Sequence, residues 1–151
     1  MKALIDHINE ALKIGNNLSE WSAYSCQPKD KEELEQIIKD RISKEGPNCD
    51  LNDIDISQIT DMSYLFYGSK FDGDISRWNV SNVISMTGMF DRSKFNQDIS
   101  NWDVSKVKKM DFMFCFSKFN QDISQWKIDK DCNTDDIFED CPIRDEYKPK
   151  L

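Results

Sequence analysis

The chain has 151 residues, of which 38% are hydrophobic and 32% charged, a balance that predicts one soluble domain with a core of its own. Its formal net charge of −8 disfavours nucleic-acid binding, because an acidic surface repels phosphate groups, but it is compatible with a basic partner. No apolar run is long enough to cross a membrane and the first residues lack a signal-peptide pattern, so we expect a cytoplasmic protein.

The first part of the chain, residues 1–46, does not repeat and predicts an N-terminal helical cap. Apolar residues between Leu4 and Leu12 follow helical spacing, and Gly15 ends that pattern. We expect this helix, together with a second one, to cover the open end of the repeats that follow. A helix pair that binds a partner is the alternative.

The second helix of the cap is predicted to begin after Asp30. Asp30 and Glu33 have the spacing of a capping box, and Gly46-Pro47 ends the helix. The residues that form its apolar face are Leu34, Ile37, Ile38 and Ile42.

The rest of the chain repeats one sequence motif at a spacing of 24 residues. It reads FDGDISRWNVSNV at 71–83, FNQDISNWDVSKV at 95–107 and FNQDISQWKIDKD at 119–131. Weaker matches before and after extend the register. The predicted domains are therefore a cap, four repeats and a C-terminal tail: 1–46, 47–70, 71–94, 95–118, 119–142 and 143–151.

Each unit divides into two predicted elements. The stretch Phe-x-x-Asp-Ile-Ser-x-Trp-x-Val alternates apolar and polar residues, which predicts a short strand. The stretch Ser-x-Val-x-x-Met-x-x-Met-Phe spaces its apolar residues by three and four, which predicts a short helix that ends near Gly68 in the first unit. The serines expected as helix N-caps are Ser57, Ser81 and Ser105.

This pattern predicts an α/β repeat solenoid in which every unit buries its apolar face against a copy of itself. Identical residues of successive units should then form ladders, with isoleucine and tryptophan rows in the interior. The repeated aspartates have two interpretations: a row of carboxylates that binds cations, or a turn-forming residue repeated with its turn. They are Asp74, Asp98 and Asp122.

The sequence FNQDISNWDVSKVKKMDFMF resembles the repeat of BspA-like leucine-rich-repeat proteins, including the Mycoplasma-type lipoprotein repeats, with the pattern FNxDISxWxVSxVxxMxxMF. The resemblance covers 47–142. It implies a leucine-rich-repeat-like solenoid of bacterial or phage origin that binds other proteins. Members of that family are often surface proteins, so the resemblance also implies a surface or virion-associated location as the alternative to the cytoplasm.

Side chains that carry chemistry are sparse, and we expect neither an enzyme nor a cofactor or metal site. His7 is the single histidine, so a histidine-based triad or a multi-histidine metal site is excluded. Cys115 lies between aromatic residues and is predicted to be a buried thiol. The five cysteines show no CxxC and predict free thiols in a reducing compartment, with a Cys132–Cys141 pair left open.

Positions that change between units are the candidate partner-binding residues, because a scaffold held by fixed residues can display variable ones. Two sets belong to the predicted strands and one residue to the predicted helices. They are Arg77, Asn101 and Gln125, then Asn79, Asp103 and Lys127, and finally Phe112. Arg77 and Phe112 are the better anchors.

The sequence thus favours a non-enzymatic protein-binding repeat module. Two other hypotheses remain: a phage-type acidic inhibitor of a nucleic-acid-binding host enzyme, suggested by the net charge, and a structural or virion component that self-associates through the ends of the repeats.

Overall fold

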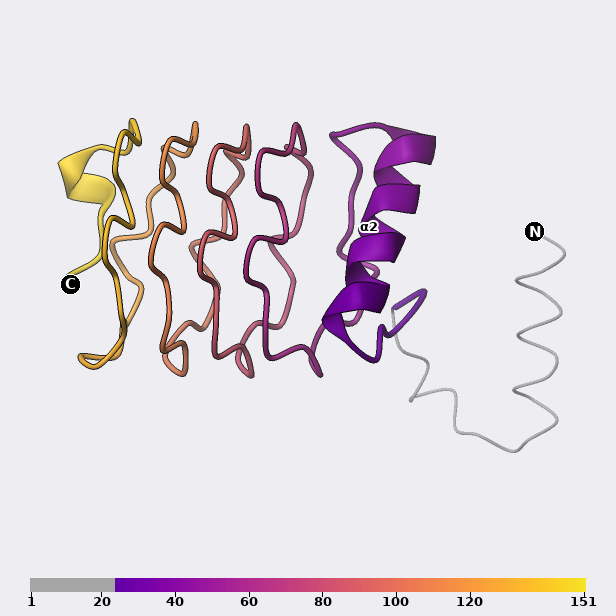
Figure 1. Ribbon diagram of the computed structural model, residues 1–151, viewed down its shortest axis with the longest axis horizontal. Helices are drawn as coiled ribbons and strands as arrows, with labels where there is room; N and C mark the ends of the chain where they lie inside the picture. The colour runs from indigo at the N-terminus through magenta and orange to yellow at the C-terminus, as the bar shows by residue number, and fades with distance from the viewer. Residues whose placement is uncertain (1–23) are drawn as a thin grey trace, which may run out of the picture.

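The structure, a computed structural model, describes residues 24–151 of the chain. Its repeats lie side by side in a row, with the helix α2 (Lys31–Glu45) at one end and the short 3₁₀ helix η2 (Asp145–Tyr147) at the other (Figure 1). The first predicted helix, around Leu4 to Leu12, lies outside the described residues.

The predicted α/β repeat solenoid, leucine-rich-repeat-like with a strand and a helix in each unit, is wrong. Within residues 24–151 the only α-helix is α2, which precedes the repeats, and there is no β-strand longer than a single bridge. Strand-like pairing between units is limited to single parallel bridges, from Asp61 to Ser85, Ser85 to Lys109 and Lys109 to Asn133. The units are built from turns instead.

The segment predicted as a helix is a run of consecutive turns, here called the turn ribbon (62–69, 86–93, 110–117 and 134–141). Alternate N–H groups close turns within the unit, such as Tyr67 N–H to the Tyr64 carbonyl at 3.1 Å. The N–H groups between them donate to the next unit, such as Tyr64 N–H to the Thr87 carbonyl at 2.9 Å. A helix would keep all of these bonds within the unit. The spacing of Met62 and Phe66 was therefore misleading, because this ribbon also turns buried residues inward at such intervals.

The segment predicted as a strand is folded by side chains, and is here called the Asx segment (71–83, 95–107 and 119–131). Asp74 Oδ1 accepts from Ser76 N–H at 2.9 Å, and Trp78 N–H donates to the Ile75 carbonyl at 3.1 Å. Asn79 Oδ1 then accepts from Ser81 N–H at 3.1 Å. Such local bonds give the backbone an alternative to strand pairing. They also explain why the predicted helix N-caps are wrong, since Ser57, Ser81 and Ser105 follow an Asx acceptor within a turn.

The predicted interior ladders of isoleucine and tryptophan are confirmed, because Ile75, Ile99 and Ile123 are buried and so are the three tryptophans of the repeats. Phenylalanine forms two further rows that were not predicted. Phenylalanine rings of successive turn ribbons stack with centroids 5.6, 5.6 and 5.8 Å apart, in the row Phe66, Phe90, Phe114 and Phe138. A second row packs beside the first at 4.6, 4.3 and 4.2 Å, and consists of Phe71, Phe95 and Phe119. All seven except the half-buried Phe138 are fully buried, and each such side chain contributes about 1.5–3 kcal/mol to folding.

The tryptophans fasten each unit to the one before it. Trp102 is buried, and its indole N–H donates to the carbonyl of Ile75 at 3.2 Å. The same bond recurs from Trp78 and Trp126, at 2.8 and 3.1 Å. A buried indole N–H needs such a partner, so the tryptophan fixes the register as well as filling the core.

Asparagine side chains form a second fastening in the Asx segments. Asn96 Oδ1 accepts from Asn120 N–H at 2.8 Å and from the Gln121 amide at 3.2 Å. In the preceding unit Asp72 Oδ1 accepts from Asn96 N–H at 2.8 Å and from the Gln97 amide at 3.0 Å. The Asn and Gln of the repeated FNQ motif thus form hydrogen bonds between neighbouring units.

Helix α2 has the predicted ends. The Asp30 side chain accepts from Glu33 N–H at 2.9 Å, and the helix ends at Gly46, where φ is 93°. Its predicted apolar face packs inward: Leu34 and Ile38 are buried in the same core as the first repeat, and Ile37 and Ile42 pack against that core.

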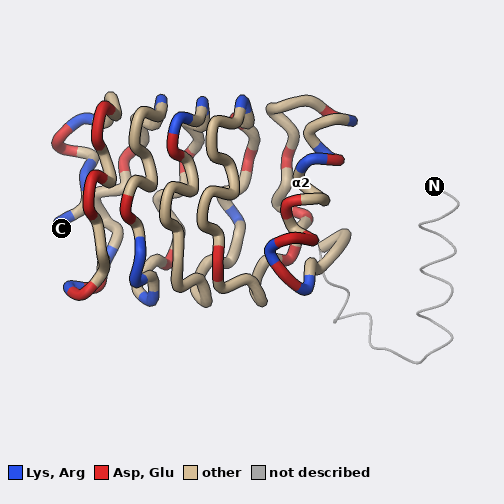
Figure 2. Tube along the Cα trace, in the orientation of Figure 1, with Lys and Arg blue, Asp and Glu red and all other residues tan. Residues whose placement is uncertain are grey.

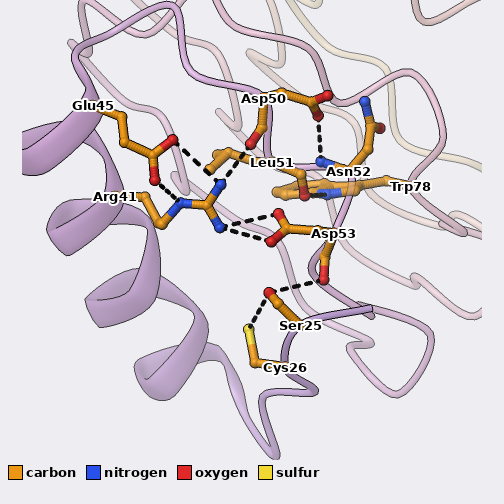
Figure 3. Close-up of polar contacts among 9 residues, drawn as sticks. All are labelled: Ser25, Cys26, Arg41, Glu45, Asp50, Leu51, Asn52, Asp53 and Trp78. Atoms are coloured by element: carbon orange, nitrogen blue, oxygen red, sulfur yellow. Dashed lines mark hydrogen bonds and ion pairs between the residues drawn. The ribbon is translucent and has the colours of Figure 1, made fainter. Parts of the chain in front are cut away.

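Arg41 ties α2 to the first repeat (Figure 3). Its guanidinium lies 3.0 Å from both carboxylate oxygens of Asp53, 2.8 Å from the Asp50 carbonyl, and pairs with Glu45 at 2.6 Å. Burial opposes ionisation of Asp53, but hydrogen bonds from Ser25 and Arg41 outweigh it and lower the pKa of that carboxyl. These charges serve the junction between the helix and the repeats.

The C-terminal residues continue the register for half a unit. Ile143 occupies the position of Phe119 and is buried, and Arg144 N–H donates to Asn120 Oδ1 at 3.1 Å, as Asn120 itself does to Asn96. Ile123 N–H donates to the Tyr147 carbonyl at 3.0 Å. The last full repeat therefore has its end covered.

Candidate functional site

The seven predicted partner-binding residues are all exposed, and they belong to two different segments of the repeat. Six lie in the Asx segments, in two columns that run from unit to unit. The first column is Arg77, Asn101 and Gln125, and the second is Asn79, Asp103 and Lys127. Phe112 stands apart from them in a turn ribbon.

Two residues of the second column have a structural role. Asn79 and Asp103 accept hydrogen bonds from the N–H groups of Ser81 and Ser105, each at 3.1 Å, and so shape the turn. The bonds from Ser105 lower the pKa of Asp103, with a further contribution from Lys127 in the next unit. The first column, here called the Arg77 column, is the better candidate of the two, because its exposed side chains do not form the turn.

The turn ribbon exposes aromatic side chains that the sequence analysis did not select. Phe112, which is 37% exposed, is joined there by three more aromatic residues. Tyr64 is 50% exposed, Tyr67 53% and Phe116 41%. We call this surface the ribbon face, and its residues are Tyr64, Tyr67, Arg92, Phe112, Phe116, Asp136 and Asp140. Exposed apolar side chains that share one surface make it a candidate contact surface.

The ribbon face is built on left-handed backbone. Two positions in every ribbon have positive φ, four residues apart, and Phe112 and Phe116 occupy them with φ of 58° and 50°. This conformation costs a non-glycine residue about 1–2 kcal/mol, and Gly, Asn or Asp bear it best. Gly68 and Gly88 fill two of the positions in the earlier units. Gly88 occupies the same repeat position as Tyr64 and Phe112, and this glycine is the feature of the sequence that could have indicated left-handed backbone there.

Side chains of the ribbon face lean from one unit onto the next. A Cβ built on Gly88 would come within 2.3 Å of the Tyr64 ring, so the ring lies directly over this glycine. The guanidinium carbon of Arg92 lies 4.6 Å from the centre of the Phe116 ring, in cation–π contact. Tyr64 and Tyr67 meet edge to face at 6.0 Å. These contacts within the chain hold the exposed side chains of the ribbon face in place.

Beside the ribbon face lies a partly buried column with perturbed acids. Burial raises the pKa of Asp91, and Arg92 offsets this only in part. One oxygen of that carboxyl is buried without a hydrogen-bond partner. In the next unit, burial together with Asp91 and Glu139 raises the pKa of Cys115 to about 11, and the predicted buried thiol is confirmed.

The repeated aspartates are turn residues, which confirms the second interpretation of the row. Each accepts from the N–H two residues ahead at 2.9 Å, as Asp74 does from Ser76, Asp98 from Ser100 and Asp122 from Ser124. Among residues 24–151, no group of three His, Cys, Asp or Glu side chains is arranged to hold a metal ion. All five cysteines are free thiols. No described helix is both long and apolar enough to cross a membrane.

Comparison with known protein families places most of the chain in one family. Residues 33–147 match the family model described as Mycoplasma protein of unknown function, DUF285. Because this match spans more than half of the chain, the protein belongs to that family. No curated protein and no solved structure matches the chain.

Proposed function

We propose that this protein is a non-enzymatic protein-binding repeat module. One observation carries the proposal: four exposed aromatic side chains sit on a preordered ribbon, two of them phenylalanines at backbone positions that favour glycine. Folding alone would select smaller or polar residues there, because an exposed ring buries little area and the left-handed backbone adds a cost. A surface kept at such a cost is a surface for contact.

The composition of the ribbon face supports a protein as the partner. Tyrosine, phenylalanine and arginine are enriched at protein interfaces, where large rigid side chains supply contact area with little loss of entropy. The resemblance of the pattern FNxDISxWxVSxVxxMxxMF to BspA-like repeats also supports protein binding. The Arg77 column remains a second candidate surface of this module.

The experiment is affinity purification from the source organism with the full-length chain and two variants. One variant replaces Tyr64, Phe112 and Phe116 by Asn, and the other replaces Arg77, Asn101 and Gln125 by Ala. We expect a specific protein to be retained by the unmodified chain and lost with the ribbon variant. Loss only with the Arg77-column variant would move the site, and the absence of any retained protein would contradict the function.

An acidic inhibitor of a nucleic-acid-binding enzyme is the second candidate, favoured by the net charge of −8 and by exposed acids in the last ribbon at Asp135, Asp136, Glu139 and Asp140. Binding of that kind depends on long-range charge. It should weaken steeply between about 0.01 and 0.15 M salt, as the screening length shortens. Retention that does not change over this range would rule the inhibitor out.

A further inference from the structure

We propose that the ribbon face binds an arginine-bearing segment of a partner protein, with the rings of Phe112 and Phe116 as platforms for guanidinium groups and Asp136 and Asp140 as counter-charges. This inference rests on the proposed function, for which it names the surface and the chemistry of the partner.

The ring of Phe116 already holds a guanidinium. Arg92, one unit earlier in the same column, places its guanidinium carbon 4.6 Å from the ring centre while 41% of Phe116 stays exposed. Cation–π contacts of this kind favour arginine, whose planar and weakly hydrated group stacks on a ring face better than an ammonium does. The ribbon face therefore shows within the chain the contact that it would make with a partner.

Phe112 offers a second ring without such an occupant. Its side chain is 37% exposed, and no ring or cation of the described residues stacks on it. The corresponding residue of the preceding unit is Gly88, which brings no side chain of its own toward the ring. Phe112 is the platform that is free to accept a guanidinium.

The unit that follows the two rings carries carboxylates at the same repeat positions. Phe112 N–H donates to the Asp135 carbonyl at 2.9 Å and Phe116 N–H to the Glu139 carbonyl at 2.8 Å, which aligns the last ribbon with the third. Asp136 and Asp140 follow these residues, occupy the equivalent ribbon positions and are exposed. Paired neighbouring chains lie about 4.8 Å apart, so a guanidinium on either ring is within reach of a carboxylate. Figure 2 shows acidic residues at this end of the row, together with several basic ones.

Charge also argues against a second copy of the chain as the occupant. Two copies with a net charge of −8 repel each other, and the ribbon face ends in carboxylates at Asp136 and Asp140. A cationic segment gains from both features, because the rings and the carboxylates attract it together.

The probe is a fluorescein-labelled twelve-residue peptide with four arginines separated by Gly-Ser spacers, titrated into the full-length protein and followed by fluorescence anisotropy. Matched peptides carry citrulline, lysine or glutamate in place of arginine. Citrulline keeps the planar group but removes its charge. We expect saturable binding of the arginine peptide, weaker binding of the lysine peptide, and none of the citrulline or glutamate peptides.

Three variants locate the site. Phe112→Asn with Phe116→Asn removes both rings at positions where Asn tolerates positive φ, so the fold is retained, and should weaken arginine-peptide binding about tenfold. Arg92→Asn removes the internal competitor and should strengthen binding about two- to fivefold. Gln125→Ala in the Arg77 column is the control and should change nothing.

Equal binding of the citrulline peptide, or unchanged affinity in the double variant, would overturn the inference. So would self-association in sedimentation that the double variant abolishes, because the occupant would then be a second copy. The protein-binding function would survive any of these results if affinity purification still retained a partner. It would fall only if no partner were retained.

Discussion

The two halves of each repeat hold neighbouring units together in different ways. The turn ribbon fastens neighbouring units with backbone bonds, such as Tyr64 N–H to the Thr87 carbonyl, and backbone bonds do not depend on which side chain points outward. The Asx segment fastens them with side chains, such as Asn96 Oδ1 and the indole of Trp102. This difference explains why one half repeats almost letter for letter while the other half varies.

The comparison teaches where specificity can reside. A side chain that serves as a fastening cannot change without breaking a contact with the next unit. A side chain on the ribbon face can change without breaking a bond between units, because the bonds beneath it are formed by the main chain. The positions equivalent to Tyr64 accordingly hold Gly88, Phe112 and Asp136.

The largest effect is expected from Trp102→Ala in an Asx segment. Trp102 is buried and bonded to the Ile75 carbonyl, so its loss leaves both a cavity and an unpaired acceptor. The free energy of unfolding should fall by about 3–5 kcal/mol, measured by urea denaturation. Trp102→Phe keeps most of the volume and should cost about 1–3 kcal/mol. An unchanged free energy of unfolding in the Phe variant would show that the indole N–H contributes nothing.

A smaller loss is expected from Asn96→Ala, which removes a fastening without opening the core. Its Oδ1 accepts from Asn120 N–H and from the Gln121 amide, and the substitution should cost about 1–3 kcal/mol in urea denaturation. Asn96→Asp is the matched control. It keeps the acceptor oxygen that Asp72 uses one unit earlier, and should cost clearly less. A loss as large in the Asp variant would contradict the side-chain ladder.

Substitutions at two glycines of the turn ribbon distinguish the cost of backbone strain from the cost of a steric clash. Gly68 and Gly88 have φ of 61° and 56°, but a Cβ at Gly68 meets nothing within 4 Å, whereas one at Gly88 meets the Tyr64 ring. Gly68→Ala should cost about 1 kcal/mol, and Gly88→Ala clearly more. Thermal unfolding of both variants measures the difference. Restoration of the second variant by Tyr64→Ala would confirm the ring as the obstacle.

The smallest effect is expected at Asp91 and depends on pH. Burial raises the pKa of its carboxyl above the ordinary value of 3.8, so the fold favours the neutral form. The stability that the group contributes is complete below the unfolded pKa and is lost as the pH rises through the folded one. Asp91→Asn should therefore raise stability relative to the unmodified chain more at pH 7 than at pH 4. Urea denaturation at the two pH values checks this, and an equal change at both would contradict the buried carboxyl.

The sequence was sufficient to predict the contacts that residues at equivalent repeat positions make with one another. The 24-residue register, the isoleucine and tryptophan rows, the turn-forming aspartates and both ends of α2 follow from patterns that depend on contact or capping. Secondary structure within the units did not follow. A spacing of three and four residues is shared by a helix and by the turn ribbon, and sequence does not show where Tyr64 N–H donates.

The candidate site was predicted only in part, for the same reason. Phe112 was selected as a variable residue, but Tyr64 and Phe116 were not, because nothing in the sequence shows that these aromatic residues lie on left-handed backbone. Asn79 and Asp103 were selected because they vary, although both form turns. The left-handed backbone turns an ordinary substitution such as Phe116 into an informative one, and that backbone is visible only in the folded chain.

The shared register sets a rule for how this molecule can change in length. An insertion of any size other than a whole unit would bring Asn96 opposite the wrong amide and Trp102 opposite the wrong carbonyl. A whole copy adds 24 residues, preserves every contact and extends the row by about 4.8 Å. Longer or shorter relatives should therefore differ by complete units, each of which adds one more row of exchangeable side chains to the ribbon.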